Sequence, residues 1–249
     1  MDMKKTLYIT IGLMTFSTLN VSAQNWKDIR NKAKSTAKEN ASGINPKGAL
    51  RQDEVGKGLK EALNQGVKKG VIQLNKKDGY LKDVQIKIPM PNEAKSVESK
   101  LRSLGQGKKV DEAIESMNRA AEDAAAGAKD IFVAAIKGMT LTDAMNILKG
   151  EDNAATNYLN KATNAALSEK FKPVIKVSLD KVGATKHWAT VFGSYNKIPF
   201  VTKVNPNLED YVTEKALNGL FIQVAKEELN IRKNPGARAT DLLKKVFGK

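Results

Sequence analysis

The sequence lacks cysteine and contains one histidine, His187, among 249 residues. The absence of cysteine excludes disulfides, thiolate metal sites, iron–sulfur clusters and a thiol nucleophile. A lone histidine excludes a metal site built from several imidazoles, and no Gly-x-Ser-x-Gly motif marks a serine nucleophile for it to assist. We interpret His187 as a helix-surface residue beside a packed tryptophan, with a catalytic base as the alternative.

Recognisable cofactor motifs are also missing. The glycines of Gly105-Gln106-Gly107-Lys108 form a basic turn without the spacing of a phosphate-binding loop, and no EF-hand loop is present. We therefore expect no cofactor and no metal. Aromatic residues make up only 6% of the chain and do not alternate with basic residues, so we do not expect nucleic acid as a partner.

The first residues have the organisation of an export signal. Lys4 and Lys5 precede a short, mostly apolar stretch, Leu7–Leu19, and Val21-Ser22-Ala23 forms a small-residue cleavage site. We expect cleavage after Ala23 and a periplasmic or secreted product; the alternative is an uncleaved N-terminal anchor. No later stretch is long and apolar enough to predict a transmembrane span in the mature chain.

The remaining sequence favours helices. Apolar residues make up 41% of the chain, which excludes wholesale disorder, and residues 92–172 contain no proline. Helical spacing predicts helices over about 49–74, from Thr140 to Gly150, from 152 or 153 to 171, over 184–195, from 207 or 208 to 231 and over 241–247. Pro173 is expected to open a separate short helix that Gly183 ends. Small and apolar residues from Ile114 to Ala135 recur every three or four positions, which predicts a close-packed helix seam.

Two short segments instead alternate between apolar and polar residues. Val84, Ile86 and Ile88 form one, and Ile198, Phe200 and Val204 form the other. Such alternation predicts half-buried strands that pair into a small ribbon. The predicted fold is therefore mainly α, a multi-helix bundle with at most a small two-stranded β ribbon. We expect a signal peptide at 1–23, a loosely attached basic segment at 24–48 and a single helical domain at 49–249.

Several segments carry a resemblance to a known family. They are Met117–Ala124, Ala135–Thr140, Ala155–Leu159, Tyr211–Thr213, Ala216–Phe221, Thr240–Gly248 and the shorter Asp78-Gly79-Tyr80 and Ile88-Pro89-Met90-Pro91. Over roughly residues 50–248 the chain resembles the bacterial family catalogued as domain of unknown function 4197. The resemblance implies an exported bacterial protein, and it transfers no catalytic residue because the family has no assigned activity.

A polar cluster on the predicted seam helix is the first candidate binding site. Asn118, Arg119 and Glu122 lie within about one helical turn, and Arg119 could bind an anionic group in bidentate fashion. The alternative is that Arg119 and Glu122 pair with each other or with another helix. We favour this structural interpretation, because such pairs are common on helices.

Glu228 is the second candidate, because it continues an apolar stripe on the last long helix, with Arg232 four residues later. A carboxylate on a buried face must be paired or protonated. We favour an internal ion pair with Arg232 or Arg119, and the alternative is an acid/base group whose pKa burial raises. Asp143 occupies the capping-box position after Thr140 and is also a candidate ligand or general acid.

The chain carries a large excess of positive charge. Lys and Arg number 42 against 27 Asp and Glu, a formal net charge of +15. This excess favours anionic partners such as anionic lipid or lipopolysaccharide, or else an envelope protein, although lysines also simply solubilise helices. We predict a non-enzymatic binding module for an anionic or amphiphilic envelope ligand. The alternatives are a carboxylate-dependent hydrolase or transferase, using Glu228, Glu122 or Asp143, and a structural or assembly factor of the envelope.

Overall fold

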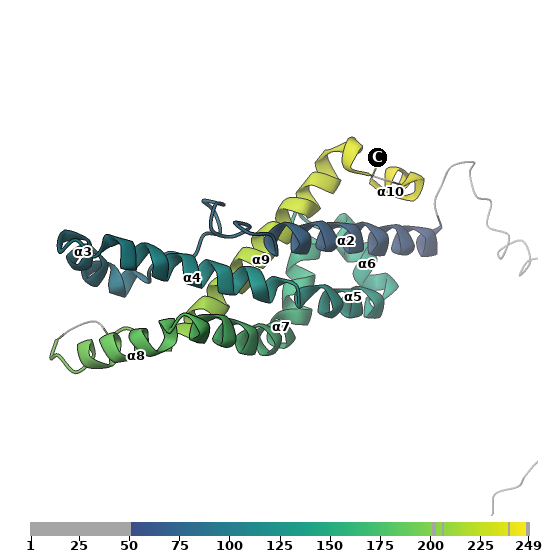
Figure 1. Ribbon diagram of the computed structural model, residues 1–249. Coiled ribbons are helices and arrows are strands. Elements are labelled where there is room, and N and C mark those ends of the chain that lie inside the picture. Colours follow the sequence, from purple (N-terminus) through teal and green to yellow (C-terminus); the bar gives the residue numbers. More distant parts are fainter. Residues whose placement is uncertain (1–50, 201–202, 206, 239, 248–249) are drawn as a thin grey trace, which may run out of the picture. The chain divides into compact units, whose positions relative to one another are not determined.

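The structure is a computed structural model that describes residues 51–200, 203–205, 207–238 and 240–247 (Figure 1). Every described residue belongs to one compact unit, Leu50–Lys249. The expected signal peptide at 1–23 and the expected basic segment at 24–48 lie outside the described residues.

Within these residues all regular secondary structure is helical, which confirms the mainly α prediction. The elements are α2 (Gln52–Leu74), η1 (Asn92–Ala94), α3 (Lys95–Ser103), α4 (Gly107–Ala125), α5 (Ala128–Gly138), α6 (Leu141–Lys149), α7 (Ala154–Lys181), α8 (Ala184–Tyr195), α9 (Leu208–Lys233), η2 (Pro235–Ala237) and α10 (Asp241–Phe247).

The core forms around two long helices, α7 and α9, which pack against each other. Helix α7 also contacts α4, α5, α6 and α8, and α9 also contacts α2, α4 and α8. The middle of the predicted seam is buried, because Met117, Ala121, Ala124 and Ala128 are each at most 1% exposed, and its ends are half-buried. Short side chains on α2 allow close approach as well, because a Cβ on Gly58 would lie 2.7 Å from Val246 of α10, which runs beside α2 (Figure 1).

Helix boundaries follow local sequence signals. Helix α6 begins with a complete capping box, in which the amide of Asp143 donates to the Thr140 hydroxyl (3.1 Å) and the Thr140 amide donates to the Asp143 carboxylate (2.9 Å). At two places the helix boundaries differ from the prediction or make it more exact. Pro173 lies inside a continuous α7 rather than at the start of a new helix, so tertiary packing outweighs the roughly 3 kcal/mol penalty of an interior proline. The seam breaks after Ala125 and resumes at Ala128.

The two predicted strands do not form in the described residues, and asparagine side chains explain why. The Ile88 amide donates to Oδ1 of Asn118, whose Nδ2 donates back to the Ile88 carbonyl, both at 2.9 Å. The Val204 backbone is bonded in the same two-way manner by Asn196, at 2.9 and 2.7 Å. A carboxamide thus takes the place of a neighbouring strand. The burial predicted from this alternation is also wrong for Ile198 and Phe200, whose side chains are exposed.

Among the described helices, none is by itself both long and apolar enough to cross a membrane. The pair α5 and α6 meets the length and composition criteria only when taken together, and the two helices are bent by 104°.

Candidate functional site

Arg119 and Glu122 form a polar network that fastens the segment after α2 onto α4. One Glu122 oxygen accepts the backbone amides of Tyr80 (3.1 Å) and Leu81 (3.2 Å), and the other accepts from Arg119 (2.7 Å). Arg119 also bonds Asp78 at 2.7 Å. The guanidinium of Arg119, followed by Lys82, lowers the pKa of Asp78. All of these partners belong to the protein itself, so the geometry supports a structural role for Arg119 and Glu122.

Asn118 neighbours this network and has equally complete contacts. Its Nδ2 donates to the carbonyls of Ile88 (2.9 Å) and Ile114 (2.8 Å), and its Oδ1 accepts the Ile88 amide. The side chain is fully buried. It therefore has little capacity left for a ligand.

Glu228 and Arg232 join three helices. The Glu228 carboxylate accepts the backbone amides of Ala155 (3.0 Å) and Thr156 (2.8 Å) at the start of α7, together with the Thr156 hydroxyl (2.8 Å). Asp152 and Asn153 are the alternative caps that the sequence predicts for this helix; Asn153 is the N-cap residue and makes no side-chain cap bond, so Glu228 supplies the cap from another helix.

Arg232 completes this arrangement. It bonds Glu228 at 2.8 Å and the Ile147 carbonyl in the last turn of α6 at 2.8 Å. An anion thus faces a helix N-terminus and a cation faces a helix C-terminus, as the helix dipoles favour. Crevices beside Glu228 measure only about 10 Å³, room for at most one water molecule.

The six predicted site residues therefore do not converge. Asn118, Arg119 and Glu122 lie together on α4, and Glu228 pairs with Arg232 rather than Arg119. Asp143 belongs to the separate capping box of α6, where hydrogen bonds from Thr140 lower the pKa of its carboxyl.

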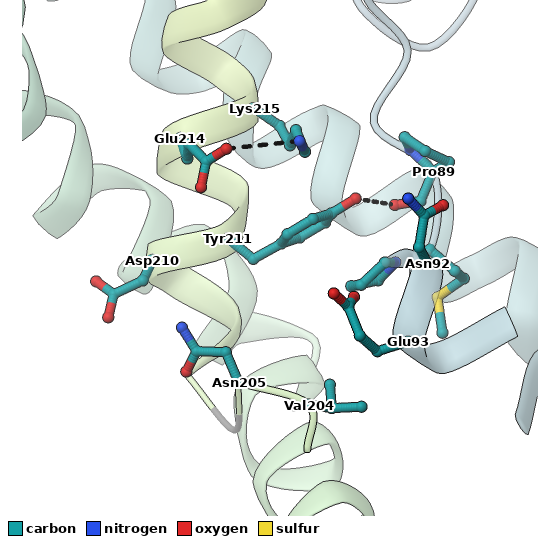
Figure 2. Close-up of a pocket in the computed structure, with 11 residues that line it drawn as sticks. Pro89, Asn92, Glu93, Val204, Asn205, Asp210, Tyr211, Glu214 and Lys215 are labelled. Carbon is teal, nitrogen blue, oxygen red and sulfur yellow. Dashed lines mark hydrogen bonds and ion pairs between the residues drawn. The ribbon is translucent and has the colours of Figure 1, made fainter. Parts of the chain in front are cut away.

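A larger cavity, of about 410 Å³, lies elsewhere, between α9, η1 and the segment before α9. We call it the Tyr211 pocket; Figure 2 shows the Tyr211 side chain crossing from α9 toward Pro89. The Tyr211 hydroxyl donates to the Pro89 carbonyl at 2.9 Å. The lining residues are Pro89, Met90, Pro91, Asn92, Glu93, Val204, Asn205, Asp210, Tyr211, Glu214 and Lys215. None of the six predicted site residues lines it.

Carboxylates dominate the charge of this pocket. Asp210 is paired with Lys172 at 2.6 Å, and Glu214 lies 3.5 Å from the ammonium group of Lys215. Glu93 makes no ion pair with the residues that the structure describes. Burial, followed by the nearby charges of Glu214 and Glu93, raises the pKa of Tyr211 to about 12. The pocket therefore combines an aromatic ring, apolar side chains and one carboxylate, that of Glu93, without an ion pair among the described residues.

One protein-family model matches most of the chain. The family described as "Protein of unknown function (DUF4197)" has a model that matches residues 49–248. The chain belongs to this family. This confirms the resemblance seen in the sequence, and the match spans all the helices described here. A search of curated proteins and a search of solved structures gave no match.

In this DUF4197 protein the pocket residues were missed by sequence reasoning. The Tyr211–Thr213 and Ile88–Pro91 segments carried the family resemblance, but neither has a recognised catalytic or ligand-binding pattern. The available signal was a tyrosine near the start of an amphipathic helix, and its contact with Pro89 spans 122 positions in the sequence. Only the folded chain brings these segments together.

A second unpredicted feature is the turn between α8 and α9. Ile198 is 54% exposed and Phe200 is fully exposed, although both are large apolar side chains. Phe200 also has a φ of 65°, which is rare for a bulky residue. In the preceding helix, α8, Trp188 and Phe192 are buried with ring centroids 4.2 Å apart.

Proposed function

We propose that this protein is an exported, non-enzymatic binding protein of the cell envelope, and that it holds an amphiphilic ligand in the Tyr211 pocket. The observation that carries the proposal is the pocket itself. Its volume of about 410 Å³ falls in the range typical of small-molecule sites. Its wall joins apolar side chains, Met90 and the prolines, to a small number of charged groups.

The charge of the pocket selects the ligand's head group. Among the described residues, the carboxylates of Glu93, Asp210 and Glu214 and one cation, Lys215, line the pocket. A ligand ammonium group would gain mainly from Glu93, because Asp210 and Glu214 are already paired with lysines. It would share the Tyr211 ring with Lys215, whose Nζ lies 5.6 Å from the ring centroid. Of the anionic or amphiphilic ligands expected from the sequence, the pocket favours an amphiphile with a primary amine.

The pocket favours binding over catalysis. Among the described residues, its lining includes no serine, threonine, cysteine or histidine, so none of them places a hydroxyl or thiol of that kind beside a general base. The alternative of a hydrolase or transferase relied on Glu122, Glu228 or Asp143. The first two carboxylates are occupied by backbone amides and arginines, and Asp143 bonds Thr140.

The experiment is a titration with n-octylamine and, separately, with octanoate, which has a similar chain and the opposite charge. Both are followed by heteronuclear NMR and calorimetry below their aggregation concentrations. We expect octylamine to shift signals around Tyr211 and octanoate to leave them unchanged. Glu93→Gln should weaken octylamine binding about tenfold, the effect of removing one charge-assisted bond.

A matched control is Glu151→Gln, which changes an exposed carboxylate away from the pocket and should leave the affinity unchanged. Equal binding of octanoate and octylamine, or no binding of either, would refute the proposed site and favour the structural or assembly role. Export is tested separately by the N-terminal sequence of the protein released from its host, which should begin at Gln24.

A further inference from the structure

We infer that the turn between α8 and α9 docks the protein onto an anionic phospholipid bilayer. We call this surface the loop tip and define it by Lys197, Ile198, Pro199, Phe200 and Lys203. It lies outside the Tyr211 pocket and serves a different purpose, so the inference goes beyond the proposed function. Three observations support it: exposed apolar side chains, a clamped base and a one-sided charge.

The apolar side chains of the loop tip point away from the core. Phe200 is fully exposed and Ile198 is 54% exposed. The left-handed backbone of Phe200, with a φ of 65°, follows a proline. A positive φ is unfavourable for a bulky residue, and such backbone outliers gather at functional sites. Phenylalanine and isoleucine at an exposed tip are suited to enter the interface between lipid head groups and acyl chains.

The base of the same turn is held firmly. Asn196 exchanges two hydrogen bonds with the Val204 backbone, and the Trp188 indole donates to the Asn205 carbonyl at 3.0 Å. These bonds close the turn across its two ends. The exposed tip therefore stands on a fixed support, which lowers the ordering cost of docking.

The charge along this stretch of the chain has one sign, although the lining of the Tyr211 pocket, which includes Val204 and Asn205, also contains carboxylates. No Asp or Glu occurs between Asp180 and Glu209, whereas Lys181, Lys186, Lys197 and Lys203 lie in this interval. Lys197 and Lys203 flank the apolar tip and are both exposed. Each lysine near an anionic bilayer strengthens binding about fivefold, so the loop tip combines an apolar anchor with electrostatic attraction. This combination favours a lipid surface over a protein partner.

Docking would also place the pocket close to the bilayer. Val204 and Asn205, which follow the loop tip in the sequence, line the Tyr211 pocket. An amine-headed amphiphile could then reach the pocket from the lipid surface. The loop tip does not depend on this connection, because its exposure and charge are independent of pocket occupancy.

The test is co-sedimentation of the protein, in the form its host produces, with vesicles of phosphatidylcholine alone or mixed with phosphatidylglycerol. We expect binding to the anionic vesicles that weakens as salt is raised. The double variant Ile198→Ser/Phe200→Ser should bind at least tenfold more weakly. The matched control is Val84→Ser, which removes a valine that is 92% exposed in another turn and should bind as the wild type does.

Insertion itself is measured with Phe200→Trp, whose fluorescence should shift to the blue on anionic vesicles, while that of Val84→Trp should not. Circular dichroism confirms that each variant is folded, and Glu93→Gln should dock normally even if its pocket is empty. The inference is overturned by equal binding to both vesicle types, by equal losses in the serine variants, or by binding to lipopolysaccharide alone.

Discussion

Replacing Glu228 by glutamine tests whether the buried carboxylate is a structural cap. The side chain is 5% exposed and accepts three hydrogen bonds from the first turn of α7 in addition to its pair with Arg232. Glutamine keeps the size of the side chain but removes the negative charge. Arg232, whose side chain is only 11% exposed, is then left without its counter-charge.

The expected loss follows from known values for such pairs. Breaking a buried ion pair by removing one partner destabilises a protein by about 3–5 kcal/mol. Because glutamine can still accept one of the amide bonds, we expect the lower end, about 3 kcal/mol. The double variant Glu228→Gln/Arg232→Met removes the stranded cation and should recover about 1–2 kcal/mol of this loss.

The assay is equilibrium unfolding in urea, followed by circular dichroism. With a slope of about 2 kcal/mol per molar, the single variant should lower the midpoint by about 1.5 M. Glu227→Gln is the control. Glu227 is the neighbour of Glu228 in the sequence, but its carboxylate makes only a 3.5 Å bond to Gln223, so the unfolding midpoint of this variant should hardly move. If Glu228→Gln kept wild-type stability, the capping argument would fail and a catalytic role would regain weight.

Three further predictions use the same unfolding assay. Asn118→Ala strands a buried backbone amide and carbonyl and should cost about 2–4 kcal/mol; a loss below 1 kcal/mol would contradict the strand-replacement role. Gly219→Ala places a Cβ 2.6 Å from the Tyr80 ring and should lower the stability by about 1–3 kcal/mol. Its control, Gly193→Ala, places a Cβ in open space and should raise the stability by about 0.5–1 kcal/mol. Equal effects of the two variants would refute the close contact between Gly219 and Tyr80. The pKa of Asp78 is lowered in the folded protein, so its carboxylate stabilises the fold fully above the ordinary pKa of 3.8 and loses this contribution as the pH falls below that value. Asp78→Asn should therefore lose less stability on acidification than the wild type. Parallel acid profiles of the two proteins would contradict this.

Local signals predicted much of the helical fold. The Thr140–Asp143 capping box and the small-residue seam from Ile114 to Ala135 each depend on neighbours within a few positions, so the sequence displays them directly. The strand prediction failed because alternation does not show what pairs with the backbone, and at Val84, Ile198 and Phe200 it did not indicate burial either. Ile86 and Ile88 are indeed buried, but a carboxamide 30 positions away supplies the hydrogen bonds of Ile88.

Long-range contacts limited the prediction of the site. The interruption of an apolar stripe by Glu228, with Arg232 one turn later, predicted an internal pair, and that pair is present. Its main role could not be seen, because the start of α7 lies 72 positions away. The Tyr211 pocket depends on segments even farther apart, and its lining residues carry no spacing that distinguishes them from ordinary surface residues.

We expect the two asparagines that bond extended backbone also to limit self-association of the protein. An unpaired extended segment with isoleucine or valine is a template onto which another chain can add, the first step toward aggregates and fibrils. Asn118 and Asn196 each fill the hydrogen-bonding positions that an incoming chain would need at Ile88 and Val204. Because Ile88 and Val204 are buried in the folded protein, we expect these bonds to matter when the connections open locally, where they keep the backbone from offering neighbouring copies an edge to extend.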